Sequence, residues 1–372
     1  MKALFLIFHG FEEFNGISKK IRYQIKALKE CGLEVYTCYY EVLPNGHRTW
    51  MIDDTILKDL GTGKIAKIKK RVSYQFISQF VAEQKIEFVY MRSYHNANPF
   101  TIKLVKEIRA LDAKVVMEIP TYPYDQEYID WNMKCELFVD KIFRRKLASN
   151  LNAIVTYSDH NYIFGQRTIR ISNGIDFSSI KPKLNRNDTS QSLNLIGVAE
   201  IHYWHGFDRI INGLHEYYTS QPLPYYKVFF HVVGTPSGVR EIREVVQLIK
   251  EKKLEEYVFL HGNQHGDNLD DLFELADLGI GSLARHRSGI TRIKTLKNRE
   301  YAARGIPFIY SEIDADFEQM PYILKITPDE SPINIKSLID FYHQVDLNPQ
   351  QIRDSIKDLS WSCQLKKVIN SL

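Results

Sequence analysis

Two lysines and a glutamate recur at every third residue in the last quarter of the chain, as Lys294, Lys297 and Glu300. If this segment is helical, steps of three place the charges on adjoining parts of one helix face. Cations beside a helix N-terminus suit a phosphate, because the free backbone N–H groups point the same way. A carboxylate one turn later suits ribose hydroxyl groups, since an ionised carboxylate only accepts hydrogen bonds. The pattern suits a nucleotide, but for a helix taken alone an ordinary solvated surface helix is the favoured interpretation, so the rest of the chain decides between them.

The surrounding sequence predicts the elements that would position these charges. Ser288-Gly289 predicts a turn, and a helix follows from about Thr291 with apolar residues at helical spacing. Gly305 suits the left-handed residue that ends a helix, and a proline two residues later blocks continuation. Residues 308–310 form a short apolar run that is typical of a buried strand. The segment therefore predicts a turn, a helix and a strand in succession.

The composition limits the class of protein. The chain has 372 residues, which is long for one core and favours two domains. Its 44% hydrophobic and 25% charged residues are ordinary for a globular protein, and a net charge of +4 is too small to indicate nucleic-acid binding. The cysteines lack CxxC spacing, which predicts reduced thiols in a cytoplasmic protein rather than a disulfide framework or a zinc site. They are Cys31, Cys38, Cys135 and Cys363.

The first ten residues differ from a signal peptide, because the apolar run is short and Gly10 and Glu12 follow it closely. Residues 3–8 instead predict a first buried strand. No apolar run approaches the length of a transmembrane helix. We therefore expect a cytoplasmic location.

Strand and helix patterns alternate almost throughout, which predicts a parallel α/β architecture. The segment 181–192 is polar, contains proline and is poor in apolar residues, which predicts a linker. We expect one doubly wound, Rossmann-like domain over 1–185 and a second over 186–354, with a final helix in 355–372. Ligands of such sheets bind beyond the carboxyl ends of the strands. The strands expected in the second domain lie at 193–198, 227–233, 258–260, 278–280 and 308–309.

Two local patterns stand apart from this alternation. Pro44-Asn45-Gly46 predicts a hairpin turn and a short antiparallel ribbon. A helix over 64–84 carries five cations in its first turns, where they oppose the helix dipole. This arrangement indicates either an external anionic partner, such as membrane lipid, or an exposed helix face. The cations are Lys64, Lys67, Lys69, Lys70 and Arg71.

Four motifs follow one another in a fixed order along the chain. They are SNGID at 172–176, HGFDR at 205–209, VVG at 232–234 and REYAARGIPFI at 299–309. Together, and over essentially the whole chain, they resemble the retaining GT-B glycosyltransferases, in particular glycosyltransferase family 4, the group 1 transferases.

The resemblance implies two Rossmann-like domains that face a central cleft, with a C-terminal helix crossing back to the first domain. A nucleotide-sugar donor would lie against the second domain and the acceptor against the first. Glu300 matches the motif glutamate that binds the donor ribose, and the Ser288-Gly289-Ile290 turn matches the loop that approaches the sugar and phosphates. Two glycines are also expected at the donor. They are Gly16 in the first loop and Gly234 in the VVG turn.

The chain also departs from the family pattern. The first motif glutamate would fall at Arg292, so that acidic contact to the sugar is missing. The family's arginine and lysine for the diphosphate are replaced by Glu200 and His205, of which His205 could still reach the diphosphate. Because a diphosphate needs compensating charge, we expect other cations to supply it. They are Lys294 and Lys297, with Arg209, Arg285 and Arg287 behind them.

Glycosyl transfer develops oxocarbenium character at the sugar and negative charge on the leaving diphosphate. We expect Lys294 and Lys297 to stabilise the leaving group, and we expect no metal and no cofactor, since no acidic pair with metal-ligand spacing stands out. His95 follows the predicted strand 88–91 and is the third catalytic candidate, in contact with the donor sugar or the acceptor. It is otherwise a loop histidine bonded to backbone. The resemblance implies that the leaving phosphate acts as the base.

These features favour a retaining glycosyltransferase that moves a hexose-type sugar from a nucleotide sugar, UDP- rather than GDP-linked. The acceptor would be a glycan, lipid-linked or protein-linked, in the synthesis of a surface polysaccharide or glycoconjugate. One alternative is a catalytically silent subunit of the same fold, which would explain the replaced motif residues. Another is a nucleotide-sugar epimerase or phosphorylase, whose carboxylates or cofactor lysine the sequence does not identify. We expect the protein in the cytoplasm, with peripheral contact at the inner face of the membrane as an option.

Overall fold

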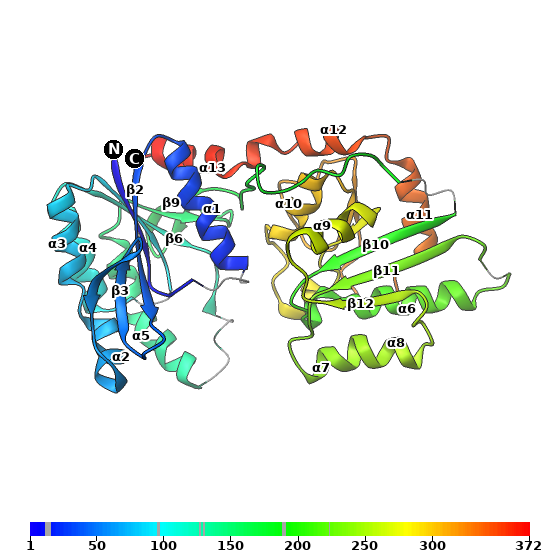
Figure 1. Cartoon of the computed structure of the whole chain (residues 1–372), viewed down its shortest axis with the longest axis horizontal. Coiled ribbons are helices and arrows are strands. Elements are labelled where there is room, and N and C mark those ends of the chain that lie inside the picture. The colour runs from blue at the N-terminus through cyan, green and yellow to red at the C-terminus, as the bar shows by residue number, and fades with distance from the viewer. Residues whose placement is uncertain (12–15, 95–96, 126–127, 129–130, 188–190, 223) are drawn as a thin grey trace. The chain divides into compact units, whose positions relative to one another are not determined.

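The structure is a computed structural model, and it describes the chain except for residues 12–15, 95–96, 126–127, 129–130, 188–190 and 223. It divides into two compact units, one of residues 1–172 with 361–372 and the other of residues 173–360. Each unit is built on a largely parallel sheet with helices packed on it (Figure 1). The predicted pair of doubly wound α/β domains is therefore confirmed.

The sheet of unit 1 is centred on β1 (Lys2–Ile7), between the parallel strands β2 (Glu34–Val42) and β5 (Phe88–Arg92). The predicted hairpin is present, because β2 pairs antiparallel with β3 (Arg48–Ile52). The strand order is β4-β3-β2-β1-β5-β6-β7-β9-β8. The remaining strands are β4 (Thr55–Asp59), β6 (Lys114–Ile119), β7 (Ala153–Thr156), β8 (Tyr162–Ile163) and β9 (Gln166–Arg170).

Both faces of this sheet are covered, which explains the unbroken apolar run of β1. Successive side chains of a strand point to opposite faces. Leu4 and Leu6 pack in one buried cluster with Ile77 of α3 (Gln75–Gln84) and residues of α4 (Pro99–Arg109). Phe5 and Ile7 pack in another, beneath α1 (Gly16–Glu30) and α13 (Trp361–Asn370). Continuous hydrophobicity is the pattern that a parallel strand buried on both faces requires.

The division between the units differs from the predicted linker. The segment expected to be a linker, 181–192, belongs to unit 2, and the chain passes between units at 172/173 and 360/361. The physical reason is that Lys183 is buried and its ammonium donates to the carbonyl groups of Glu274 and Ala276. The C-terminal helix α13 does return to unit 1, as the resemblance implied, and Trp361 is buried there.

The predicted basic helix over 64–84 is two helices, α2 (Gly63–Val72) and α3. The break follows from Tyr74, which is 5% exposed and turns its ring into the core of unit 1. There the ring lies edge-on to Phe8 and Trp50, with centroids 5.8 and 5.9 Å away. Not all of the cations point outward, since Lys70 is half-buried and its ammonium lies 4.0 Å from the centre of the Tyr40 ring.

The sheet of unit 2 is wholly parallel, in the order β12-β11-β10-β13-β14-β15. The five strands expected from the sequence are all present, and the sixth, β15 (Ile323–Lys325), was not foreseen. The others are β10 (Ser192–Val198), β11 (Lys227–Val233), β12 (Val258–Gly262), β13 (Leu278–Ile280) and β14 (Phe308–Tyr310). The helices are α6 (Phe207–Thr219), α7 (Val239–Glu241), α8 (Leu248–Glu251), α9 (Gly266–Leu275), α10 (Leu296–Arg304), α11 (Ile335–Gln344) and α12 (Pro349–Asp354).

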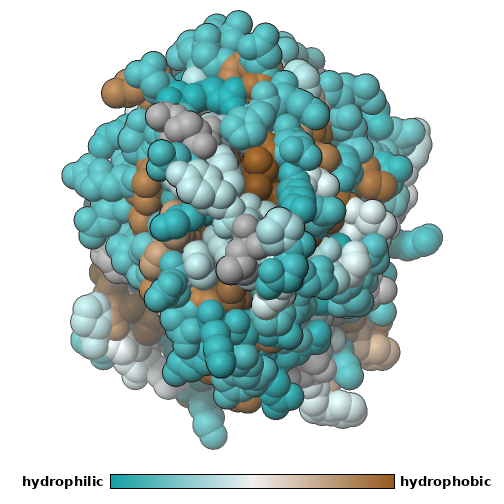
Figure 2. Space-filling model, turned by 90° about the vertical axis from the view of Figure 1, so that its right-hand side faces the viewer, coloured by the Kyte–Doolittle hydropathy of each residue, from teal (hydrophilic) through white to brown (hydrophobic). Residues whose placement is uncertain are grey.

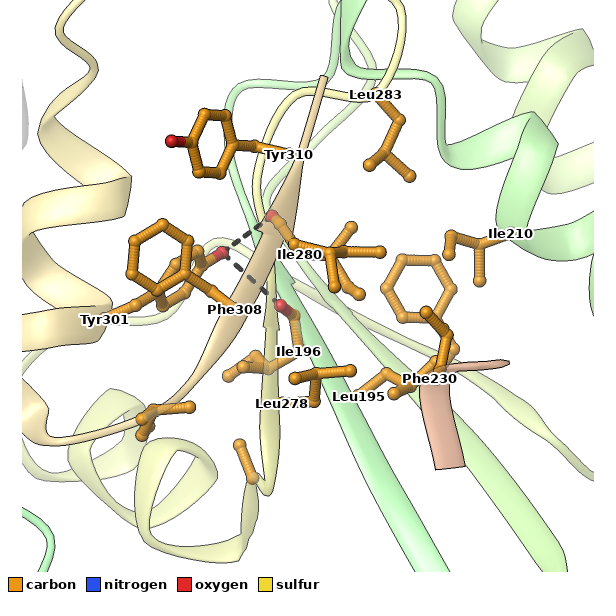
Figure 3. Close-up of a cluster of buried hydrophobic side chains, with 14 of the residues drawn as sticks. Leu195, Ile196, Ile210, Phe230, Leu278, Ile280, Leu283, Tyr301, Phe308 and Tyr310 are labelled. Atoms are coloured by element: carbon orange, nitrogen blue, oxygen red, sulfur yellow. Dashed lines mark hydrogen bonds between the residues drawn. The ribbon is translucent and has the colours of Figure 1, made fainter. Parts of the chain in front are cut away.

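The helix α10 is fixed to this sheet by the hydroxyl group of Tyr301 (Figure 3). That hydroxyl lies 2.9 Å from the carbonyl oxygen of Ile280 and 3.3 Å from that of Ile196, at the carboxyl ends of β13 and β10. The ring fits because residue 279 is glycine, where a Cβ atom would lie only 2.6 Å from the tyrosine ring. Asn298 and Lys297 lie three and four positions before Tyr301 on α10, so they share this side of the helix.

The face of the molecule in Figure 2 is covered mainly by hydrophilic residues, and its hydrophobic residues lie in small groups. Such a surface is usual for a folded domain. Within the described ranges, no helix combines the length and the apolar character that crossing a bilayer requires.

Trp361→Ala tests whether α13 is an integral part of unit 1. The indole is 2% exposed in the core of that unit, so its loss should cost about 3–5 kcal/mol of unfolding free energy. Trp131→Ala is the matched control, because that side chain is 79% exposed and its loss should change stability by less than about 0.5 kcal/mol. Denaturant unfolding of the full chain measures both, and equal small effects would show that α13 does not stabilise unit 1.

Candidate functional site

The segment that opened the sequence analysis forms a turn, a short extended stretch, and then α10. Residues 285–288 form a 3₁₀ turn that ends at Gly289, whose φ is +69°. The helix expected from Thr291 begins only at Leu296, because the residues before it are extended. The backbone N–H of Ile293 donates to the carbonyl of Ile313, and the N–H of Ile313 donates to that of Thr291. Pairing with the chain after β14 therefore delays the helix.

The side chain of Lys297 lies in the first turn of α10, four residues before Tyr301. Its ammonium nitrogen is shielded from solvent and has no hydrogen-bond partner among the described residues. Burial, together with the charge of Arg285, lowers the pKa of Lys297 to about 7, against the opposing effect of Glu312. A buried ammonium without hydrogen bonds is costly, so this position is unfavourable in the isolated protein.

Three other polar side chains near Lys297 also carry buried atoms without partners among the described residues. They are Ser282 through Oγ, Asn298 through Oδ1 and Glu312 through Oε2. Ser282 follows β13 and Glu312 follows β14, while Asn298 is the neighbour of Lys297 on α10 and donates to Glu312 Oε1 over 3.3 Å. We call Ser282, Lys297, Asn298 and Glu312 the carboxyl-edge cluster. It lies where a parallel sheet binds its ligand.

Two further residues of unit 2 contribute to the electrostatics of the carboxyl-edge cluster. His205 is 5% exposed, and burial together with the charges of Lys297 and Arg285 holds its pKa well below the ordinary value. Its Nδ1 accepts from the backbone N–H of His202 over 3.0 Å, so the neutral ring carries its proton on Nε2. Arg285 places its guanidinium 5.4 Å from the centre of the Trp204 ring.

The carboxyl-edge cluster and its neighbours are suited to an anion. Lys297 and Arg285 are cationic, and the neutral ring of His205 is an N–H donor. Burial raises the pKa of Glu312, so its carboxyl group opposes an incoming anion less than an exposed carboxylate would. Positive charge and buried donors at the end of a parallel sheet are the features of a phosphate site.

Four of the predicted site residues make other contacts. Arg287 pairs with Asp208 at 2.8 Å and with Glu330, and it donates to the carbonyl of Tyr203. The buried guanidinium of Arg209 donates to the carbonyls of Leu283, Thr327 and Ser331 and pairs with Asp329 at 2.7 Å, so its donors hold backbone together. Glu300 pairs with Arg304 at 3.0 Å. Lys294 precedes α10 rather than lying on it, and its ammonium is 3.8 Å from Asp316. The expected face of Lys294, Lys297 and Glu300 is therefore not formed, because only the last two are helical.

The remaining predicted residues are spread over both units. Ser288 donates its hydroxyl to the carbonyl of Arg285, and Ile290 lies just beyond it, half-buried, in the turn that leads to the carboxyl-edge cluster. Gly234 follows β11 with a φ of +121°, and a Cβ atom there would lie 1.7 Å from the carbonyl oxygen of Ala199. Gly16 is the first residue of α1, in open space. His95 lies outside the described residues.

Unit 1 has a buried polar network of its own at the carboxyl ends of its strands. Glu118, which is fully buried at the end of β6, accepts from Tyr90 over 2.6 Å and from Gln24 over 2.5 Å, and pairs with Arg92. Lys20 of α1 lies 3.7 Å from the same carboxylate. Burial alone would raise the pKa of Glu118, but the two cations hold it at about 2. Because the charge of Glu118 is paired within the protein, a structural role is enough to explain this network.

The sequence analysis did not single out Ser282, Asn298 or Glu312. A signal for two of them was present, since a polar residue directly after a short apolar strand lies at the ligand-binding edge of a parallel sheet. Asn298 had no such signal. Its importance depends on the position at which α10 begins, which the pairing with Ile313 determines.

No family model matches the sequence, and no curated protein sequence matches it. Solved structures do match. Sucrose-phosphate synthase from Thermosynechococcus elongatus is similar with a TM-score of 0.64 and 13% identity, over 99% of this chain and 98% of that one. Anabaena HepE in complex with UDP is similar with a TM-score of 0.62 and 16% identity, over 100% of both chains.

The catalytic domain of starch synthase IV from Arabidopsis thaliana, bound to ADP and acarbose, is also similar. Its TM-score is 0.64 at 13% identity, over 100% of this chain and 98% of that one. The likeness spans nearly the full length of each solved chain. This chain therefore has the fold of the GT-B glycosyltransferases, with two Rossmann-like domains.

Lys297→Met should stabilise the protein at neutral pH, because it removes a buried ammonium that lacks hydrogen bonds. In the unfolded chain a lysine has a pKa of about 10.4. Between pH 7 and that value the unfolded chain binds more protons than the folded one, so the penalty of Lys297 declines as pH rises. We expect the melting temperature to rise by about 2–4 °C at pH 7, equivalent to ~1 kcal/mol in a unit of this size, and by less at pH 10.

Lys183→Met is the matched control for that measurement. Lys183 is also buried, but its ammonium donates to two carbonyl groups, so its loss leaves acceptors without partners and should lower the melting temperature. If Lys297→Met were as destabilising as Lys183→Met at pH 7, the ammonium of Lys297 would be a structural partner of Glu312 rather than a group that awaits a ligand.

Proposed function

We propose that this chain is a glycosyltransferase that binds a nucleotide-sugar donor at the carboxyl-edge cluster of unit 2. The observation that carries the proposal is the group of buried polar atoms there, on Ser282, Lys297, Asn298 and Glu312, that have no hydrogen-bond partner among the described residues. Native proteins satisfy nearly all such atoms, and a bound ligand is one way to do so. The likeness to GT-B structures that contain UDP or ADP supports the choice of ligand class.

The diphosphate is the part of the donor that this arrangement suits best. Its charge would be balanced by Lys297 and Arg285, and the Nε2–H of His205 adds a donor. An anion beside Lys297 also favours the charged form of the ammonium and raises its depressed pKa. Because negative charge on the diphosphate increases as the bond to the sugar breaks, the same contacts would strengthen in the transition state. The proposal involves no metal ion.

The finer parts of the proposal rest on the motif order in the sequence. We propose retention of anomeric configuration, a hexose-type sugar carried on UDP rather than GDP, and the leaving phosphate as the base for the acceptor hydroxyl. Glu300 remains the proposed ribose ligand, for which it would have to share its carboxylate with Arg304 or release it. We place the acceptor, a glycan or a lipid- or protein-linked saccharide, against unit 1, where His95 remains a candidate contact.

A catalytically silent subunit of the same fold is the second candidate. The observation in its favour is the replacement of three motif residues, with Glu200 and the exposed Arg292 among them. Such a subunit could retain donor binding without transfer. Binding and turnover must therefore be measured separately.

Calorimetric titration with UDP, UDP-glucose, GDP and ADP tests the donor site. We expect wild-type protein to bind at least one of these ligands, with UDP-glucose tighter than GDP. Lys297→Met should weaken binding about 10- to 150-fold, which corresponds to the loss of one charged hydrogen bond. The exposed Lys336→Met on α11 is the matched control and should bind as the wild type does.

Absence of binding to every nucleotide, with the protein folded, would refute both the transferase and the silent-subunit forms of the proposal. Binding that Lys297→Met leaves unchanged would refute the assigned site. Release of UDP from UDP-glucose in the presence of saccharide acceptors, or with water as the acceptor, distinguishes an enzyme from a silent subunit that binds without turnover.

A further inference from the structure

The helix α5 (Trp131–Ala148) of unit 1 has a line of apolar side chains on its outward face. Trp131, Phe138 and Ile142 are 79%, 66% and 55% exposed, and the exposed Cys135 lies between them. Their spacing of four, three and four residues places them on one side of the helix. The opposite side holds the helix to the core through Leu137 and Leu147, which are 7% and 2% exposed. Both sides of α5 are therefore apolar, but only one is covered.

Cations flank this apolar line. Lys134, Arg145 and Lys146 lie on the same half of α5, are exposed, and pair with no carboxylate within the described ranges. The acidic residues of α5 lie elsewhere on the helix, since Asp140 is buried and Glu136 pairs with Arg71 of α2. The exposed half of α5 therefore combines apolar side chains with cations that pair with no described carboxylate.

The helix α2 carries a second exposed surface of the same kind. Its Ile65 and Ile68 are 69% and 62% exposed, and the helix contains no acidic residue. The ion pair between Arg71 and Glu136 joins α2 to α5, and the two helices lie at the same end of unit 1 (Figure 1). Three further exposed cations lie on α2, namely Lys64, Lys67 and Lys69.

We propose that these outward faces of α2 and α5 dock on a membrane surface that carries anionic lipid headgroups. Amphipathic helices with aromatic and aliphatic side chains on one face and lysines beside them bind in the plane of the interface, where the rings enter the acyl boundary and the cations meet the headgroups. The charge also argues against a second copy of this chain as the partner. A two-fold contact would bring the same cationic surface against itself, which is repulsive.

Membrane docking through α2 and α5 does not depend on the donor site of unit 2. In the sequence, the charges of the predicted basic helix indicated either an external anionic partner or an exposed helix face. The structure adds the exposed apolar side chains of α5. A surface that binds at a membrane interface has such side chains, whereas a surface that is only cationic does not. Docking through α2 and α5 would hold unit 1 at a lipid surface, so an acceptor presented there would reach it by diffusion in two dimensions.

Co-sedimentation of the full chain with lipid vesicles tests the surface. We expect binding to phosphatidylcholine vesicles that contain phosphatidylglycerol, much weaker binding to phosphatidylcholine alone, and release as salt rises from about 50 to about 500 mM. The double variant Lys134→Glu/Arg145→Glu should lower the partition coefficient about 25-fold or more, at about fivefold for each cation removed. Phe138→Ser/Ile142→Ser should lower it as well.

Matched variants in unit 2 control for charge and hydrophobicity. Lys250→Glu/Lys336→Glu changes two exposed lysines, and Tyr225→Ser/Val239→Ser changes two side chains that are 86% and 77% exposed. Both should bind vesicles as the wild type does, and all four variants should keep the wild-type melting temperature. Failure of the folded wild type to bind anionic vesicles would overturn the proposal. So would equal losses in the α5 and control variants, which would point to net charge alone, or full binding by the α5 variants.

Discussion

The contact between the Tyr301 hydroxyl and the ends of β10 and β13 determines where the candidate site lies. It fixes α10 to the sheet with a hydrogen bond of 2.9 Å to the carbonyl of Ile280, and it needs the space that Gly279 leaves. One turn earlier on the helix, Lys297 and Asn298 are thereby placed near Ser282 and Glu312, which follow β13 and β14. Tyr301 is itself packed in the hydrophobic core of unit 2. The core therefore holds α10, and with it Lys297 and Asn298, in place.

The site that results is unfavourable when empty. An ammonium group, a carboxyl group, an amide and a hydroxyl are buried together without full sets of hydrogen bonds. Proteins tolerate such arrangements where function requires them, and the rest of the fold supplies the stability. Unit 1 shows the contrast, because the equally buried Glu118 accepts from two side chains and lies beside two cations. The charge of Glu118 is paired within the protein, whereas Lys297 has no hydrogen-bond partner among the described residues.

The sequence predicted the architecture well, because the periodicity of apolar residues follows directly from burial. The runs of β1 and of five strands in unit 2 could be recognised for this reason. The break at Tyr74 and the late start of α10 could not, since each depends on a tertiary contact, with Trp50 and with Ile313 respectively. The unit boundary was misplaced because the polar segment near Lys183 is held by carbonyl groups distant in sequence.

The candidate site shows the same limit. Lys297 was found from its spacing, but the reason for its importance, a buried ammonium without hydrogen bonds, is a property of the packing alone. Arg209 was predicted from its charge. In the structure its guanidinium donates hydrogen bonds to three backbone carbonyls and pairs with Asp329. Charge spacing in a sequence identifies candidate ligands, and packing decides which of them have donors left to offer.

Proton uptake on binding of UDP-glucose tests the central claim most directly. The diphosphate of UDP-glucose lacks a terminal phosphate that titrates near neutrality, whereas burial lowers the pKa of Lys297 to about 7 and an adjacent anion would raise it again. Calorimetry at pH 8 in buffers of different ionisation enthalpy should show net proton uptake on binding in the wild type and none in Lys297→Met. Binding without proton uptake, or uptake that persists in Lys297→Met, would contradict the assignment of Lys297 to the diphosphate.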